Sequence, residues 1–358
     1  MSGTSLDGID LVAAEFGQGA PRILASLSRP WPEALRARLL LVTAPGWRGD
    51  WSEMGSLHAE LGSEYAAACA RLLADPALDG CAVQAIGLHG QTVHHAPDAP
   101  HPFSLQLGDA SRVAERCGVT VVSDFRSRDL AAGGQGAPLV PAAHRAFFHS
   151  PEEDRAVLNL GGIANLTLLP ARGPVTGFDT GPGNTLMDRW VQRHRQQPCD
   201  TDGRWAASGR VDEALLARLL EAPYFAAPPP KSTGTEYFNL DWLAPHLSAD
   251  LVPADTQATL LALTVESVAE ALARAMPHCR RLLVCGGGAR NSLLMQRLTE
   301  RLAGITVEDT ARHGIPPTLV EATAFAWLAA RTLAGQPGNL PQVTGASHPV
   351  VLGCIHPA

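Results

Sequence analysis

The chain has 358 residues, of which 46% are hydrophobic and 18% are charged. This is a globular composition, and it excludes a disordered chain and a coiled coil, because both need a larger polar or charged share. The formal net charge of −7 argues against a nucleic-acid partner, whose phosphates attract basic surfaces. A chain of this length predicts two domains.

Cysteine usage and hydropathy indicate a cellular compartment. The seven cysteines are scattered and contain no close Cys-x-x-Cys pair, which predicts neither a disulfide framework nor a zinc site. No apolar run reaches the ~20 residues that span a membrane, and no basic segment precedes an apolar one at the N-terminus. We therefore expect a soluble, cytoplasmic protein without a membrane partner.

The first half of the chain alternates strand patterns with helical periodicity, which is typical of α/β layering. A strand is predicted at residues 9–16 and a helix at about 52–73, before Pro76. Strands at 82–88 and 119–123 each end in polar residues, and ligands bind at the carboxyl ends of such strands. These polar residues are His89-Gly90-Gln91-Thr92 and Asp124-Phe125-Arg126.

The second half repeats this organisation. Strands are predicted at 155–160 and 164–169, and a glycine-rich loop follows in which Asp179 comes directly after an apolar strand. The later predicted elements are a helix at 185–195, an exposed loop at Pro228-Pro229-Pro230, a helix at 256–276, a strand at 281–285, a glycine loop at Gly286-Gly287-Gly288, a helix at 291–303, a strand at 305–308 and a helix at about 318–333.

Three glycine loops have residues suited to phosphate. Residues 3–10 combine glycines, hydroxyls and two carboxylates, so they can donate hydrogen bonds to phosphate oxygens and hold Mg²⁺ through water. Residues 179–184 and 286–291 are similar, and neither a P-loop nor a strict Rossmann motif occurs. An empty β-turn explains the first loop equally well, and close strand–helix packing can explain the triple glycine. Two acidic turns in separate halves nevertheless favour a cleft that holds one phosphate chain from both sides.

Other polar residues support competing chemistry less well. His89, His94 and His95 lack the spacing of a metal site, so we interpret them as surface or substrate-contacting histidines. Neither Ser5 nor Ser232 lies in the Gly-x-Ser-x-Gly turn of a hydrolase nucleophile. The sequence therefore favours phosphate chemistry over metal or hydrolase chemistry.

Lys231 is the single lysine among 28 basic residues. Codon bias towards arginine explains most of this pattern. The alternative is a compact ammonium group in a confined place, where a guanidinium does not substitute well. Both interpretations stay open at the level of sequence.

Taken together, six separated motifs resemble the anhydro-N-acetylmuramic acid kinase family over essentially the whole chain. The motifs are Met1-Ser2-Gly3-Thr4-Ser5-Leu6-Asp7-Gly8-Ile9-Asp10, Gly90-Gln91-Thr92, Ala132-Gly133-Gly134-Gln135-Gly136-Ala137-Pro138, Asn159-Leu160-Gly161-Gly162-Ile163-Ala164-Asn165, residues 177–184 and Cys285-Gly286-Gly287-Gly288. The resemblance implies an α/β fold of two actin-like (ribonuclease H-like) domains around a nucleotide cleft. We expect the N-terminal domain to comprise residues 1–130 plus about 340–358, and the C-terminal domain to comprise 131–339.

The family's reaction converts ATP, water and 1,6-anhydro-N-acetylmuramic acid into N-acetylmuramic acid 6-phosphate and ADP, in peptidoglycan recycling. The resemblance implies that Asp179 is the catalytic base and acts on water, because O6 of the anhydro sugar carries no proton. It implies ATP binding by Gly3, Thr4, Ser5, Leu6, Asp7, Gly8, Ile9, Asp10, Gly286, Gly287 and Gly288. Asp7 or Asp10 is expected to orient Mg²⁺ through water, and Thr92, Arg126 and Glu321 are expected to contact the sugar. A homodimer is a further expectation from the family.

Two departures from the family pattern raise expectations of their own. Family members carry several apolar residues before the Met-Ser-Gly-Thr-Ser motif, so we expect a first strand that is either truncated here or begins upstream of Met1. Thr235 stands where the family usually has arginine, and any role of that arginine is in doubt. The alternative functions are a kinase for another amino sugar and a nucleotide-gated binding module of Hsp70 or actin type.

Overall fold

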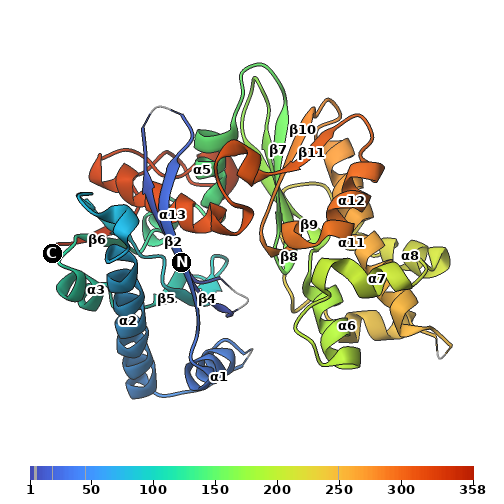
Figure 1. Ribbon diagram of the computed structural model, residues 1–358, viewed down its shortest axis with the longest axis horizontal. Coiled ribbons are helices and arrows are strands. Elements are labelled where there is room, and N and C mark those ends of the chain that lie inside the picture. Colours follow the sequence, from blue (N-terminus) through green and yellow to red (C-terminus); the bar gives the residue numbers. More distant parts are fainter. Residues whose placement is uncertain (4–5, 18, 45, 249) are drawn as a thin grey trace. The chain divides into compact units, whose positions relative to one another are not determined.

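The computed structural model describes residues 1–3, 6–17, 19–44, 46–248 and 250–358 (Figure 1). Thr4 and Ser5, both predicted to bind phosphate, lie outside the described residues. The chain forms two compact units, Met1–Phe147 with Leu319–Ala358 and Phe148–Thr318. Both units combine helices with sheets, which confirms the predicted α/β class.

The first unit contains three small sheets. β1 pairs antiparallel with β2, β4 pairs antiparallel with β5, and β3, β6 and β12 form the third sheet. The strands are β1 (Gly8–Glu15), β2 (Arg22–Pro30), β3 (Ile86–Gly87), β4 (Gln91–Ala96), β5 (Phe103–Leu107), β6 (Val121–Ser123) and β12 (Cys354–His356). The helices are α1 (Glu33–Val42), α2 (Trp51–Leu73), α3 (Ala110–Cys117), α4 (Ser127–Ala131), α5 (Val140–Phe148, whose last residue belongs to the second unit), α13 (Val320–Leu333) and α14 (Pro341–Thr344).

Helix α2 confirms the prediction of a helix at about 52–73. The Asp50 carboxylate caps it by accepting a 2.7 Å hydrogen bond from the Glu53 N–H. Leu57, Leu61 and Tyr65 recur at helical spacing and are buried against the first unit's core. Helical periodicity alone was therefore sufficient to locate this element.

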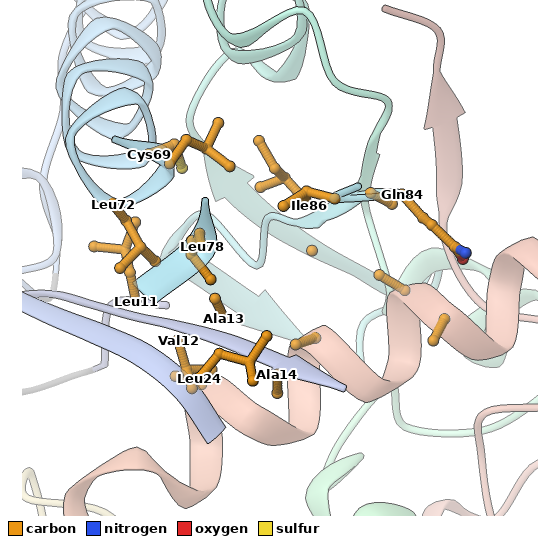
Figure 2. A pocket seen from close by; sticks show the side chains of 18 of the residues that line it. Leu11, Val12, Ala13, Ala14, Leu24, Cys69, Leu72, Leu78, Gln84 and Ile86 are labelled. Atoms are coloured by element: carbon orange, nitrogen blue, oxygen red, sulfur yellow. The ribbon is translucent and has the colours of Figure 1, made fainter. Parts of the chain in front are cut away.

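The predicted strand at 82–88 is wrong in length, because only Ile86–Gly87 pair with a neighbour, β6. A cavity of about 680 Å³ lies between this segment and β1. Figure 2 shows Leu11, Ala13 and Ile86 among the apolar side chains that line it. Residues 81–85 have no ladder partner, and an extended segment is a strand only where a neighbouring strand accepts its hydrogen bonds.

One five-stranded sheet in the order β11-β10-β7-β8-β9 organises the second unit. β7, β8 and β9 are antiparallel neighbours, whereas β10 and β11 add in parallel beyond β7. This order agrees with the expected actin-like domain. The strands are β7 (Arg155–Leu160), β8 (Ile163–Leu169), β9 (Thr176–Pro182), β10 (Arg281–Cys285) and β11 (Thr306–Asp309). The helices are α6 (Thr185–Arg195), α7 (Arg204–Ser208), α8 (Glu213–Leu220), α9 (Pro223–Ala226), α10 (Leu240–Leu243), α11 (Pro253–Ala275) and α12 (Ser292–Arg301).

The prediction that Asp179 lies in a loop after a strand is wrong. Asp179 lies within β9, which extends from Thr176 to Pro182 and pairs with β8. The pairing shifts at Ala164/Asn165, and such an irregularity lets a glycine-rich strand continue past a turn-like sequence. Strand β1, Gly8–Glu15, confirms the strand predicted at 9–16, and it also takes in Gly8 of the first glycine loop.

The boundaries of the two compact units differ from the domain boundaries expected at residues 130/131 and 339/340. Residues 131–147 and 319–339 belong to the first unit. The reason is packing, because α13 contacts β1, β3 and β6. Phe325 and Leu328 of α13 are buried in a core with Val122 and Phe125.

Candidate functional site

Polar side chains form a row across the sheet of the second unit. The strand register places Cys285 of β10 beside Asn159 of β7, Asn159 beside Asn165 of β8, and Asn165 beside Asp179 of β9. Directly paired residues project from the same face of a sheet. Asp179 thus shares a face with two asparagine amides, which sequence reasoning did not identify as site residues.

Three backbone turns meet beside this row. Gly183 approaches Gly161 so closely that a Cβ atom on Gly183 would lie 2.3 Å from the Gly161 carbonyl oxygen. The Asn184 side-chain amide donates to the Leu160 carbonyl at 2.9 Å. Gly286 has φ +83°, and a Cβ there would lie 2.4 Å from the Asn159 amide oxygen. Glycine is therefore required at these positions by close backbone approach.

The Asp179 carboxylate is half-buried and only partly engaged. Its Oδ2 accepts a 3.0 Å hydrogen bond from the Thr233 N–H. Burial raises the pKa of Asp179, and the Thr233 N–H opposes this by stabilising the carboxylate. Within the described residues Oδ1 accepts no hydrogen bond. The geometry provides a carboxylate with raised proton affinity and a free oxygen.

In the first unit, Ser2 and Gly3 lie close to β4 and α2. The Gln91 amide donates to the Gly3 carbonyl at 3.3 Å, and the Ser2 hydroxyl lies 2.5 Å from the Tyr65 hydroxyl. Leu6 is buried at φ +56°, a left-handed conformation that is uncommon for a bulky residue. The structure therefore holds Leu6 in a backbone conformation that this residue type does not favour locally.

The two candidate metal-orienting carboxylates differ in their surroundings. Asp7 is exposed, and its Oδ1 lies 3.9 Å from the Arg36 guanidinium. Asp10 is half-buried on β1 and accepts a 2.5 Å hydrogen bond from the Ser28 hydroxyl. Among the described residues, no group of three or more His, Cys, Asp or Glu side chains is placed to hold a metal ion. Each carboxylate can serve a cation that also has phosphate and water ligands.

Arg126 is held by a chain of hydrogen bonds in the first unit. Its guanidinium donates to the Gly136 carbonyl at 2.9 Å and to Nε2 of His89 at 3.0 Å. Nδ1 of His89 lies 2.7 Å from the Gly90 carbonyl, which defines the tautomer in which Nδ1 donates. Burial, and then the Arg126 charge, hold the pKa of His89 well below its usual range. His89 is therefore a neutral, buried partner of Arg126 and not a surface residue.

Arg126 keeps unused donor capacity. Its buried Nε has no hydrogen-bond partner. No carboxylate lies within ion-pair distance of its guanidinium in the described part of the chain. Burial lowers its pKa to about 10, and the guanidinium remains charged at neutral pH. A half-buried cation with a free donor is suited to an anionic ligand.

The other two predicted sugar-contacting residues belong to the same unit. Glu321 lies in the first turn of α13, where burial raises its pKa, the Arg126 charge lowers it and the Asp10 charge raises it. The Thr92 hydroxyl on β4 accepts a 3.2 Å hydrogen bond from the Gln106 amide. The structure thus brings Asp10 and Arg126 each within electrostatic range of Glu321.

Asp129 organises the glycine loop at residues 132–138 and escaped sequence reasoning. The side chain is fully buried, and its Oδ2 accepts from the Gly136 N–H at 2.8 Å. Its Oδ1 accepts from the Asn339 amide and the Thr344 hydroxyl, both at 2.7 Å. The Gly136 carbonyl accepts a hydrogen bond from Arg126, so the Asp129 carboxylate, which binds the Gly136 N–H, also stabilises the position of Arg126. Two of its three partners, Asn339 and Thr344, are 210 and 215 positions away, so no local signal marks this role.

No helix in the described ranges is both long and apolar enough to cross a membrane. None of the seven cysteines, all within the described ranges, forms a disulfide bond.

A family model for anhydro-N-acetylmuramic acid kinase matches residues 1–358. An anhydro-N-acetylmuramic acid kinase of Xanthomonas campestris pv. campestris (strain 8004) is 52% identical to the whole chain, which covers 96% of that relative. The Xanthomonas axonopodis pv. citri kinase is 53% identical to the whole chain, with 97% of the relative covered. The Xylella fastidiosa kinase is 51% identical, with 95% covered.

Solved structures show more distant similarity. A ROK family glucokinase from Streptomyces griseus is 14% identical with a TM-score of 0.33, over 87% of this chain and 97% of that one. A ROK hexokinase from Thermus thermophilus is 16% identical with a TM-score of 0.34, over 90% and 100% of the two chains. These TM-scores are too low to add to the family assignment.

Proposed function

Because the chain belongs to the anhydro-N-acetylmuramic acid kinase family, it is a phosphotransferase, and we propose that Asp179 is its general base. The observation that carries this proposal is the half-buried carboxylate with one free oxygen and a raised pKa. A base whose pKa is raised towards the working pH takes protons more effectively.

The reaction opens the anhydro ring and phosphorylates the sugar in one coupled process. Asp179 takes a proton from water while the water oxygen attacks C1. The C1–O6 bond breaks, O6 forms a bond to the γ-phosphorus of ATP, and ADP leaves. The products are N-acetylmuramic acid 6-phosphate and ADP, and Asp179 later releases its proton to solvent. The product belongs to the recycling of peptidoglycan.

Two glycine-containing segments are proposed to bind ATP. Residues 3–10 are proposed to bind the phosphates and Gly286-Gly287-Gly288 the adenosine side, and the open space beside Gly287 supports the second assignment. A bound Mg²⁺ would neutralise phosphate charge during transfer. Asp7 or Asp10 would hold this ion through water.

Arg126 is proposed to bind the lactyl carboxylate of the sugar. The support is its unpartnered, buried Nε and the absence of an ion-pair partner among the described residues. Glu321 and Thr92 are proposed to accept or donate hydrogen bonds to sugar hydroxyl or amide groups. We further propose that the enzyme works in the cytoplasm and forms a homodimer. Size-exclusion chromatography with light scattering can test the dimer by its molar mass.

The test of this function is turnover with ATP, Mg²⁺ and the anhydro sugar in ¹⁸O-water. The expected product carries ¹⁸O at C1 and unlabelled phosphate at O6, read before the anomeric oxygen exchanges. ATP turnover that ignores the sugar, or ¹⁸O in the phosphate, would contradict the coupled reaction. Phosphorylation of another amino sugar at a free hydroxyl, without incorporated ¹⁸O, would favour the alternative kinase.

The Asp179→Asn variant tests the base. It should fold and bind ATP, and kcat should fall by about 10²–10⁴-fold, the usual contribution of general base catalysis. The matched control is Asp241→Asn, which changes an exposed carboxylate of the same unit and should keep wild-type kcat. A near-normal kcat in Asp179→Asn would remove Asp179 from the mechanism.

A further inference from the structure

The single lysine of the chain has a defined structural place. The Lys231 ammonium donates to the Tyr224 carbonyl at 2.9 Å and to the Phe225 carbonyl at 3.3 Å. Its nitrogen lies 4.6 Å from the centre of the Tyr224 ring. Both carbonyls belong to α9, and the Tyr224 carbonyl also accepts a 3.3 Å hydrogen bond from the Ala227 N–H. The ammonium therefore adds a donor at the C-terminal end of α9, whose last carbonyls have few partners within the helix.

Residues 231–233, which Lys231 anchors, also form hydrogen bonds with Asp179. The Asp179 N–H donates to the Lys231 carbonyl at 3.1 Å, and the Thr233 N–H donates to Asp179 Oδ2 at 3.0 Å. The Tyr224 hydroxyl donates to the Asp179 carbonyl at 2.8 Å. Lys231, Tyr224 and Thr233 thus hold the backbone N–H, the carbonyl and the carboxylate of Asp179, respectively.

The contacts explain why lysine suits this position. An ammonium offers three donors from one atom, so it can serve two adjacent carbonyls while standing over a ring face. A guanidinium is a planar fork that fits carboxylates and phosphates better. Arg274 already donates to the Phe225 carbonyl at 3.2 Å, which leaves little room for a second guanidinium. Burial, and then the Arg274 charge, lower the pKa of Lys231, so a cation is retained here against an unfavourable environment.

We propose that Lys231 is a positioning residue for Asp179: by anchoring residues 231–233 to α9, it directs the carboxylate through the Thr233 N–H. The inference rests on the proposed role of Asp179 as base. Lys231 itself touches neither the reacting atoms nor the Asp179 side chain. A substitution of Lys231 should therefore change kcat and the pH dependence that reports the protonation of Asp179.

The test compares Lys231→Met with the wild type. We expect kcat to fall by about 10–100-fold, because small misplacements of catalytic groups have effects of that size, while KM for ATP changes by less than about twofold. Loss of the Thr233 hydrogen bond raises the pKa of Asp179, so the acid limb of the kcat/KM–pH profile should move to higher pH. Hydrogen exchange of the Thr233 amide should accelerate. Lys231→Arg should recover only part of kcat.

The matched control is Arg274→Met, which removes the neighbouring cation from the same carbonyl but leaves residues 231–233 anchored. It should keep the wild-type acid limb. The positioning role is refuted if the activity of Lys231→Met falls only as much as its fraction of folded protein falls. In that case the acid limb of the pH profile and the hydrogen exchange of the Thr233 amide would be unchanged. A fully active Lys231→Arg would refute the need for lysine. An inactive wild type would refute the proposed function instead.

Discussion

The buried Asp129 carboxylate offers a stability prediction whose size follows from its contacts. Asp129→Ala leaves three donors without their acceptor, namely the Gly136 N–H, the Asn339 amide and the Thr344 hydroxyl. The Thr344 hydroxyl can turn to the Leu340 carbonyl, 3.5 Å away, so two donors remain buried and unpaired. At about 1–3 kcal/mol for each orphaned donor, and with a small cavity added, we expect a loss of about 3–5 kcal/mol.

Thermal and urea unfolding measure this loss. In a domain of about 150–250 residues, a loss of 4 kcal/mol lowers Tm by about 8–16 °C. Asp129→Asn keeps one acceptor oxygen and should lose about half as much free energy. Glu115→Ala, which changes an exposed carboxylate on α3, should stay within about 0.5 kcal/mol of the wild type. A loss below 1 kcal/mol in Asp129→Ala would show that the carboxylate does not organise this loop.

Two further predictions concern the second unit. Gly183→Ala places a Cβ against the Gly161 carbonyl, so the free energy of unfolding should fall by about 1–3 kcal/mol. Calorimetry should also show weaker ATP binding. An unchanged ATP affinity would show that this turn is not part of the nucleotide site. The hydrogen bond from Arg281 at 2.8 Å lowers the pKa of Glu153 in the folded protein. Its contribution to stability is therefore present above the unfolded pKa of about 4.3 and is lost as pH falls through the folded pKa. Acid unfolding of Glu153→Gln should show a shallower pH slope, and an unchanged slope would contradict this ion pair.

Local sequence patterns predicted most of the second unit. The strand at 155–160 and the helix at 185–195 coincide with β7 and α6. These elements carry their own periodicity and are bounded by turns, so neighbouring residues suffice to define them. In the first unit, the segment at 82–88 has the same apolar character but is mostly not a strand. Strand formation depends on a partner elsewhere in the chain, which local patterns do not report.

The candidate site divides in the same way. The amino-acid sequence by itself determined the glycine turns, the acidic residue Asp179 and the family, because these depend on residue type at fixed spacing. Only the tertiary structure placed Asp179 inside β9 and gave its carboxylate the Thr233 N–H, 54 positions away. It also joined Arg126 to His89 across 37 positions and Asp129 to Thr344 across 215. Such pairings are decided by packing, since contacts between distant segments form only when the core brings them together.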